Sequence, residues 1–258
     1  MTLLGLNDPP AVSEFNTEGN ANLLLTSDHN GCTIPDKLND LGVPKHELRR
    51  HVAYDIGIDG VAQSLAERFD APLVVSNYSR LVVDCNRRPG TAASIPVVSD
   101  RTKVTGNENL KRSDKKSREF EIFYPYHNAI EKRIRQMRQK SKVSRGPILI
   151  ALHSFTPVMN GVFRPWQIGV LWKDNDELAR PLIEALRSDS SLCIGDNQPY
   201  SGSEPAGYTF EEHVLNHDLI SVAIEFRQDL VEFQSGAEYW ADVFATCLET
   251  VLSQYNFY

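Results

Sequence analysis

The sequence has no long apolar run, no paired-cysteine motif and no recognisable export signal. No run approaches the roughly 18 apolar residues that a membrane-spanning helix needs. The four cysteines, Cys32, Cys85, Cys193 and Cys247, show no CxxC spacing, which favours reduced thiols in a cytosolic protein. The N-terminal stretch MTLLGLNDPP lacks a basic region and a long apolar core, so no secretory signal is expected. We therefore expect a soluble, cytoplasmic protein.

Motifs of several common enzyme classes are also missing. There is no Walker loop, no GxGxxG and no HExxH, and no GxSxG elbow surrounds Ser154. The formal charge is -7, with 27 basic and 34 acidic residues, so nothing suggests a phosphate-backbone partner. The one basic cluster, 111–142, is interrupted by acidic and apolar residues and is typical of a solvated helix face. We expect neither a nucleic-acid nor a membrane partner, and the oligomeric state is not predicted.

What the sequence does contain is an alternation of strand-like and helical patterns. At 258 residues it is long enough for one sizeable core, and α/β chains of this length are commonly single domains. The alternation predicts an α/β fold with a mostly parallel mixed sheet and helices on both faces. Residues 1–20 are polar and are expected to be a lead-in segment. The expected strands are 21–27, 72–76, 148–152, 167–172, 191–194 and 221–226, and the expected helices are 44–69, 117–139, 175–187 and 236–252.

Other segments carry more local expectations. A short strand is expected at 81–83, and the long polar stretch 90–117 is typical of a lid or binding loop. Pro125 should start a fresh turn or kink its helix. A second long loop covers 195–207, and Thr209 with Glu212 has the spacing of a helix-capping box.

Three strand-like runs end in a residue suited to hydrolytic chemistry. His29 lies near the end of the run LLLTSDHNG, His153 near the end of ILIALHS, and Glu225 near the end of LISVAIEFRQD. Because the carboxyl ends of parallel strands line the binding crevice of an open sheet, these side chains should meet there. One histidine at a strand end is as often a buried structural residue as a ligand. Two of them beside a glutamate favour a hydrolytic metal with a general base.

A third metal ligand is needed, because catalytic zinc typically takes three protein ligands and leaves a fourth position for water. In the expected helix 44–69, His51 and Asp55 fall inside the apolar stripe. A carboxylate that points into a core requires a cation or a partner, so Asp55 is the first candidate and Asp28 the second. The alternative is that Asp55 forms an ion pair with an arginine or orients a histidine.

Two arginines are candidates for binding a substrate carboxylate. Arg80 and Arg87 lie on or beside the expected strand 81–83, where a guanidinium needs an acidic partner. The rigid fork of the guanidinium suits a carboxylate. Asn86 adds a neutral donor next to Arg87.

At these residues the chain resembles the N-formylglutamate amidohydrolase family over nearly its whole length. The resemblance implies a zinc-exopeptidase-like (phosphorylase/hydrolase-like) α/β fold, similar to zinc carboxypeptidases and aspartoacylase, with residues 21–258 as the catalytic domain. It also implies removal of a formyl or other small acyl group from the nitrogen of an amino acid, with a divalent metal, zinc first among the candidates. The matching blocks are HVAYDIG, YSRLVVDCNRRP, FYPYH, LHSFTPVMNG, RPWQIGVL, GDNQPYS and IEFRQDL.

The resemblance also implies roles for the metal-side residues. In the aspartoacylase and carboxypeptidase relatives, a HxxE pair and a distant histidine bind zinc, and a glutamate on a late strand is the base. By this resemblance His29 and His153 match the two histidines and Glu225 matches the base. The last position of the HxxE motif is Cys32 in this chain, so the resemblance leaves the third ligand unassigned.

On the substrate side, the same relatives use an Asn-Arg pair to grip the substrate carboxylate. Asn86 and Arg87 match this pair, and Arg80 resembles a further arginine. The resulting hypothesis is a metal-dependent amidohydrolase acting on a small N-acyl amino acid such as N-formylglutamate. Two alternatives remain, which are a metallocarboxypeptidase-like hydrolase of short peptides and a non-catalytic module that binds acidic metabolites.

Overall fold

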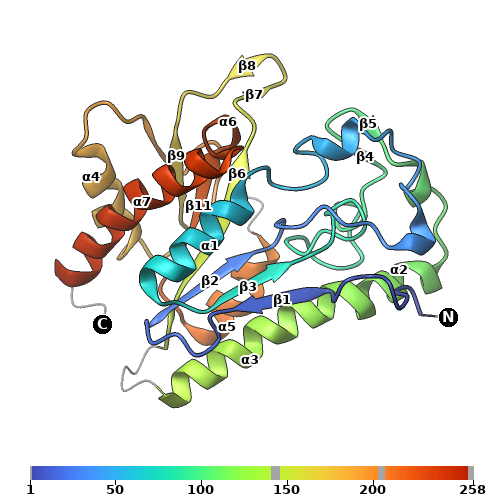
Figure 1. Cartoon of the computed structure of the whole chain (residues 1–258), viewed down its shortest axis with the longest axis horizontal. Helices are drawn as coiled ribbons and strands as arrows, with labels where there is room; N and C mark the ends of the chain where they lie inside the picture. Colours follow the sequence, from blue (N-terminus) through green and yellow to red (C-terminus); the bar gives the residue numbers. More distant parts are fainter. Residues whose placement is uncertain (1, 141–145, 203–206, 255–258) are drawn as a thin grey trace.

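The computed structural model describes residues 2–140, 146–202 and 207–254. Its centre is a seven-stranded sheet in the order β1-β3-β2-β6-β11-β9-β10, with helices on both faces (Figure 1). This confirms the expected α/β class. The strands are β1 (Val12–Phe15), β2 (Leu23–Ser27), β3 (Leu73–Ser76), β6 (Ile148–Phe155), β9 (Ile168–Leu171), β10 (Ile194–Asp196) and β11 (Ser221–Arg227).

The central strands run parallel, so their carboxyl ends lie at one edge of the sheet. β3, β2, β6 and β11 pair in parallel, and β11 then pairs antiparallel with β9. β6 is the longest strand and is buried along its full length. A strand covered on both faces reads as a continuous apolar run, which is the pattern that its sequence shows.

Helices cover both faces of this sheet. α1 (Ile58–Phe69), α4 (Ala179–Arg187) and α7 (Gln234–Gln254) lie over one face, and α3 (Tyr124–Lys140) lies over the other (Figure 1). Alternate residues of β6 therefore enter different cores. Ile150 and Leu152 pack with α1 and α7, while Leu149 and Ala151 pack with α3. His153 continues the second series and so points to the α3 face.

Shorter elements fill the connections. Two hairpins stand outside the main sheet, β4–β5 and β7–β8. Among the residues that the structure describes, no helix is long and apolar enough to cross a membrane. The bounds are η1 (Asp36–Leu38), η2 (Glu47–Arg49), β4 (Val98–Ser99), β5 (Thr102–Lys103), η3 (Thr105–Asn107), α2 (Arg112–Arg118), the π-helix η4 (Glu119–Phe123), β7 (Val158–Met159), β8 (Val162–Phe163), the π-helix η5 (Phe210–Val214), α5 (Leu215–His217) and α6 (Gln228–Val231).

Several expected element boundaries are wrong; the strand expected at 191–194, for example, is β10 and begins only at Ile194. The helix expected over 44–69 begins only at Ile58, after the short turn η2 and a loop. Gly57 is the N-cap residue, and its left-handed backbone (φ +78°) is not helical, so the helix begins after it; the backbone of Val231 approaches it too closely for a side chain. The expected lead-in 1–20 contributes β1, which pairs antiparallel with β3 as the edge strand.

Two further expectations about local structure need correction. Residues 81–83 are fully buried but form turns rather than a strand. The polar stretch 90–117 is not one loop, since it holds the β4–β5 hairpin and most of α2. Pro125 lies in the first turn of α3, directly after the π-helix η4. A proline cannot make the i→i−4 hydrogen bond of an α-helix, and the π-helix turn that directly precedes it already departs from that hydrogen-bond pattern.

Candidate metal centre and active-site pocket

The sheet brings three predicted residues to one place. His153 and Glu225 are direct neighbours in the parallel pairing of β6 with β11, so both side chains point to the same face. His29 follows the end of β2, the strand that pairs with β6 on its other side. All three side chains are buried. The imidazole rings of His29 and His153 lie 5.2 Å apart between centroids.

Asp55 joins the two histidines from the loop before α1. The backbone N–H of Asp55 donates to the carbonyl of His29 at 2.9 Å, which brings the carboxylate under the imidazoles. Its Oδ2 lies 3.0 Å from Nδ1 of His153 and 3.5 Å from Nδ1 of His29. Asp55 therefore points inward as expected, but from a loop and not from a helix.

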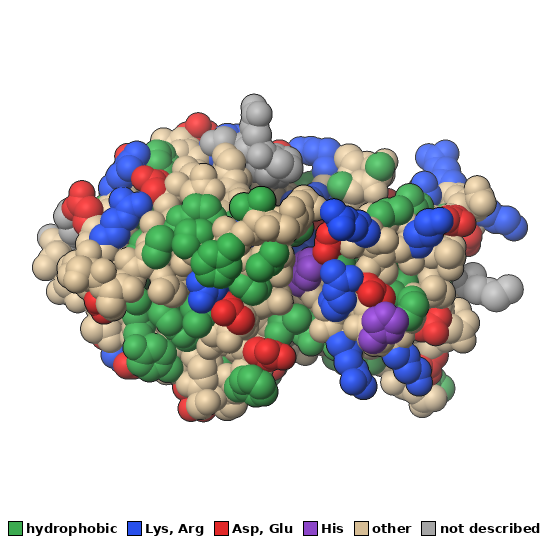
Figure 2. Space-filling model, turned by 90° about the horizontal axis from the view of Figure 1, so that it is seen from above, with side chains coloured by type: hydrophobic (Ala, Val, Ile, Leu, Met, Phe, Trp, Pro, Cys, Tyr) green, Lys and Arg blue, Asp and Glu red, His purple; other side chains and the backbone are tan. Residues whose placement is uncertain are grey.

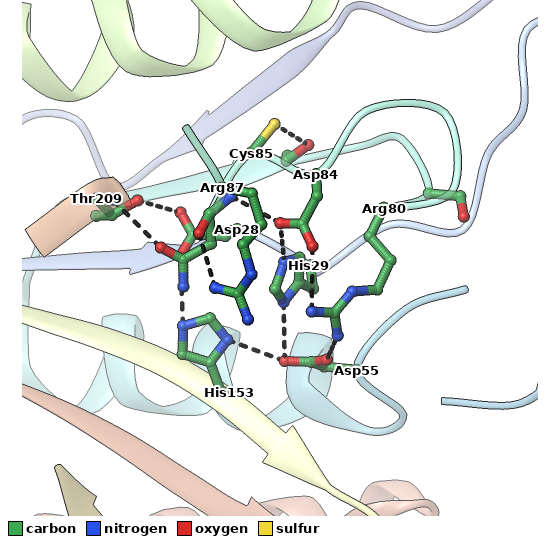
Figure 3. A network of polar contacts seen from close by, with 12 residues as sticks. Asp28, His29, Asp55, Arg80, Asp84, Cys85, Arg87, His153 and Thr209 are labelled. Atoms are coloured by element: carbon green, nitrogen blue, oxygen red, sulfur yellow. Dashed lines mark hydrogen bonds and ion pairs between the residues drawn. The ribbon is translucent and has the colours of Figure 1, made fainter. Parts of the chain in front are cut away.

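The far nitrogen of each imidazole faces another buried carboxylate (Figure 3). Nε2 of His29 lies 2.8 Å from Oδ1 of Asp84, and Nε2 of His153 lies 3.3 Å from Oδ2 of Asp28. The hydroxyl of Thr209 donates to Oδ1 of Asp28 at 2.5 Å. A carboxylate can only accept, so Nε2 of each imidazole carries a hydrogen, and Nδ1 is the nitrogen that can bind a cation on the Asp55 side once it is deprotonated.

Asp28, the second candidate for a ligand, thus lies on the outer side of His153. Its carboxylate and that of Asp84 occupy the positions that orienting carboxylates take beside metal-bound histidines. Thr209 does not cap the π-helix η5 with its side chain, because its hydroxyl is engaged with Asp28. This corrects the expected capping box.

Arg80 holds two of the carboxylates together. Its Nη1 donates to Oδ1 of Asp55 at 3.2 Å, and its Nη2 donates to Oδ2 of Asp84 at 3.3 Å. Both contacts are drawn in Figure 3. The guanidinium lines the pocket, but its acidic partners belong to the protein. Binding of a substrate carboxylate by Arg80 stays a prediction. The two ion pairs argue against it, because they already occupy the guanidinium.

The residues present fit a divalent cation. Nδ1 of each histidine and one oxygen of Asp55 lie within 4.8 Å of one another, and tetrahedral ligands at about 2.1 Å from a metal are roughly 3.4 Å apart. Within the described chain, Nδ1 of His29 is buried without a hydrogen-bond partner. Although burial opposes it, hydrogen bonds to Asp28 and Asp55 raise the pKa of His153 well above its usual range, as expected of a site with excess negative charge.

Glu225 is the direct neighbour of His153 in the pairing of β11 with β6. Its buried Oε2 has no hydrogen-bond partner in the part of the chain that the structure describes. Burial raises the pKa of Glu225 to about 7, and the nearby charge of Asp55 adds to the rise. A carboxyl group with a pKa near neutrality can both take up and release a proton in turnover.

A cavity of about 210 Å³ opens onto these groups. The surface seen in Figure 2 gathers hydrophobic side chains on one half and many Lys and Arg side chains on the other. The cavity itself is lined by both charged and apolar side chains. Its lining comprises Asp28, His29, Asp55, Arg80, Asn86, Arg87, Ala151, His153, Ser154, Leu171, Trp172, Tyr200, Ser201, Gly202, Gly207, Thr209, Phe210, Ala223 and Glu225.

Arg87 and Asn86 lie in this lining as the sequence predicts. Nη1 of Arg87 donates to the carbonyl of Asn86 at 2.9 Å, and no acidic partner of Arg87 is found among the described residues. Oδ1 of Asn86 accepts from the backbone N–H of Thr209 at 3.2 Å, which fixes the amide. Figure 3 shows the Arg87 guanidinium beside His29 and His153.

Sequence patterns missed Asp84 and Thr209 as parts of the site. Asp84 has a usable signal, because it lies four residues after Arg80 and ends a buried segment. Thr209 has none, since its partner Asp28 is 181 positions away. Only the folded chain brings these two residues together.

A buried histidine pair supports the loop that carries Asp84 and Asn86. Nε2 of His127 donates to the carbonyl of Cys85 at 2.8 Å, and Nδ1 of His127 faces Nε2 of His213 at 3.0 Å. The rings are stacked, with centroids 5.2 Å apart. Burial lowers the pKa of each to about 4, so both are neutral at pH 7.

Comparison with known proteins supports the fold. The chain is 31% identical to a gene product of Agrobacterium tumefaciens of known structure, with a TM-score of 0.92 and 98% coverage of each chain. An N-formylglutamate amidohydrolase from Ralstonia eutropha is similar in fold, with a TM-score of 0.66 and 16% identity over 96% of this chain and 98% of that one. The comparison with curated proteins found no match.

A family model provides the functional assignment. The model described as N-formylglutamate amidohydrolase matches residues 21–232, a span that includes both histidines, Asp55 and Glu225. The chain belongs to the N-formylglutamate amidohydrolase family and is a hydrolase of amide bonds.

Proposed function

We propose that this protein is a metal-dependent amidohydrolase that removes a formyl or other small acyl group from an N-acyl amino acid such as N-formylglutamate. One observation carries the proposal. Two imidazole nitrogens and a carboxylate oxygen converge within 4.8 Å, beside the unpaired oxygen of Glu225, at the wall of one cavity. Membership of an amide-hydrolase family supports the choice of reaction.

The cation would be held by Nδ1 of His29, Nδ1 of His153 and Oδ2 of Asp55. When bound, a divalent cation supplies a Lewis acid that polarises the amide carbonyl. Asp84 and Asp28 orient the two imidazoles through their Nε2–H groups. Orienting carboxylates of this kind keep the ligand tautomer fixed and raise its basicity.

Glu225 acts as the general base and then as the general acid. Its carboxylate takes one proton from the attacking water while the water oxygen bonds to the amide carbon. The C–N bond then breaks, and Glu225 returns the proton to the leaving nitrogen, so the carboxylate is regenerated. Its pKa of about 7 suits both transfers. The products are formate, or another small carboxylate, and the free amino acid.

Arg87 and Asn86 bind the carboxylate of the amino acid. The guanidinium is partly buried and forms no ion pair with a protein carboxylate among the described residues, although, against the effect of burial, its charge helps to lower the pKa of Asp84. An anionic substrate group would therefore complete its pairing. Holding this carboxylate fixes the amide between Glu225 and the cation site, which is the orientation contribution to catalysis. Arg80 has a different role, because it holds Asp55 and Asp84 in place.

The proposal is tested by turnover with defined metals. The purified protein is stripped with a chelator, reloaded with zinc or manganese, and assayed with N-formyl and N-acetyl amino acids beside dipeptides. We expect release of formate from N-formyl amino acids only after reloading, with metal content near one ion per chain by elemental analysis.

Other results would point elsewhere. Faster cleavage of dipeptides than of N-formyl amino acids would favour the carboxypeptidase-like alternative. A protein that takes up no metal and hydrolyses nothing, yet binds acidic metabolites, would favour the non-catalytic module.

A further inference from the structure

The strands that carry the proposed base also form an apolar floor to the cavity. His153 and Glu225 are paired across β6 and β11. Two residues earlier on each strand, Ala151 pairs with Ala223, and Ala223 pairs with Leu171 of β9. Residues two apart on a strand face the same side. The row Ala151–Ala223–Leu171, which we call the apolar floor, therefore lies directly beside His153 and Glu225.

The floor is open because two of its three residues are alanines. All three line the cavity, and two adjacent alanines leave room that larger aliphatic residues would fill. Phe210 and Trp172 complete the apolar side of the lining. The indole N–H of Trp172 is already donated to Asp196 at 2.7 Å, so the tryptophan offers the cavity a ring and no hydrogen-bond donor.

The cavity has a cation for only one carboxylate. Arg80 and Arg87 are the only Lys or Arg residues in its described lining, and Arg80 is held by Asp55 and Asp84. Arg87 remains for the α-carboxylate of the substrate. A second carboxylate, such as that of a glutamate side chain, would be buried on the apolar floor without a partner, which is unfavourable.

The apolar floor is also next to Asn86 and Arg87, the residues proposed to bind the substrate carboxylate, which we call the clamp. The backbone N–H of Thr209 donates to Asn86. The following residue, Phe210, lines the cavity, and both Phe210 and Ala223 pack against the core cluster that contains Ala151. The carboxylate and the side chain of an amino acid leave the same carbon. The amide nitrogen leaves that carbon too, but the amide lies at Glu225 and a formyl group has no carbon chain, so the side chain of the amino acid is the group left to fill the apolar floor.

We propose that the preferred substrate is an N-acyl amino acid with an apolar side chain, such as a leucine, methionine or phenylalanine derivative, seated on the apolar floor. This inference rests on the proposed function and specifies its substrate class. It predicts that N-formyl-leucine is a better substrate than N-formylglutamate. A difference of about tenfold or more in kcat/KM is expected, because a buried polar group left unpaired discriminates strongly.

The test compares kcat/KM of the metal-loaded protein for N-formyl-leucine, N-formylglycine and N-formylglutamate. In Ala223→Leu the added side chain fills the floor, so the leucine-to-glycine ratio of kcat/KM should fall at least about tenfold. Ala92→Leu makes the same change at an exposed alanine outside the cavity and should leave that ratio unchanged. A wild-type preference for N-formylglutamate, or an unchanged ratio in Ala223→Leu, would overturn the inference.

Two further measurements keep the test decisive. If Ala223→Leu does not fold, Leu171→Ala enlarges the same floor, and the ratio for N-formylphenylalanine over N-formyl-leucine should rise; an unchanged ratio counts against the floor. If wild type hydrolyses none of these compounds, the proposed function fails. Calorimetric binding of N-formyl-leucine and N-formylglutamate to metal-free protein then decides the inference separately, since tighter binding of the leucine compound supports it and the reverse overturns it.

Discussion

Nε2 of His29 donates its hydrogen to Oδ1 of Asp84 across 2.8 Å, with both side chains buried. This contact turns Nδ1 of His29 toward Asp55 and fixes the tautomer that a metal needs. Asp84 is in turn held by Arg80 and by the backbone N–H of Asn86. The proposed metal centre and the proposed substrate clamp are thus joined through one carboxylate.

Asp84→Asn should weaken metal binding while leaving all three proposed ligands in place. Loss of the anionic acceptor lowers the basicity of His29 and loosens its orientation, so the affinity for zinc should fall about 10- to 100-fold. Competition with a chromophoric chelator measures this directly. Asp189→Asn, at an exposed surface turn, is the matched control, and equal affinities in wild type and both variants would remove the orienting role of Asp84.

Glu225→Gln should abolish turnover and spare binding. The amide keeps the size of the side chain but cannot accept the proton of the attacking water, so kcat should fall about 10²- to 10⁴-fold. Substrate affinity, measured by calorimetry, should change little. The exposed Glu232→Gln variant controls for the chemical change, and a Glu225→Gln enzyme with near-normal kcat would show that another group is the base.

Arg87→Ala should act on substrates according to their charge. A charged hydrogen bond contributes about 1.5–3 kcal/mol, so KM for an N-formyl amino acid should rise at least about tenfold. The matching amino-acid amide, which has no carboxylate, should be affected far less. The neighbouring Arg88, exposed and paired with Glu211, provides the control Arg88→Ala. Equal losses on the acid and the amide would contradict the clamp.

Acid should destabilise the fold through the buried pair His127 and His213. Burial lowers the pKa of each to about 4 in the folded protein, against about 6.5 in the unfolded chain. Between these values the unfolded chain binds protons that the folded chain does not, so the free energy of unfolding falls as pH decreases from about 6.5 to about 4.

Urea unfolding at pH 6.5 and pH 4.5 measures this loss. His213→Gln keeps a donor for His127 but cannot titrate, so its loss of stability between the two pH values should be about 2 kcal/mol smaller than that of wild type. His46→Gln removes an exposed histidine and should follow wild type. Parallel behaviour of His213→Gln and wild type would contradict the assignment of the pH dependence to this pair.

The convergence of His29, His153 and Glu225 was predictable from the sequence. Each lies within two residues of the carboxyl end of a strand, and parallel strands deliver such residues to one edge of the sheet. The sequence also predicted that the side chain of Asp55 points inward. That prediction assumed a helix over 44–69, whereas the helix begins only at Ile58. The inward position of Asp55 comes from the backbone bond to His29, a contact that helical periodicity does not describe.

The sequence by itself determined the α/β class, the buried central strands and the chemistry at their ends, because period and residue type are local properties of the chain. Only the tertiary structure decided which carboxylate orients which imidazole, that Arg80 is held by the protein's own acids, and that Ala151 and Ala223 lie side by side. These contacts join segments as much as 181 positions apart. They depend on strand order, register and loop packing, which are set by the burial of the whole core. Of these contacts, only the ion pair of Arg80 with Asp84, four positions apart, has a signal in a short segment.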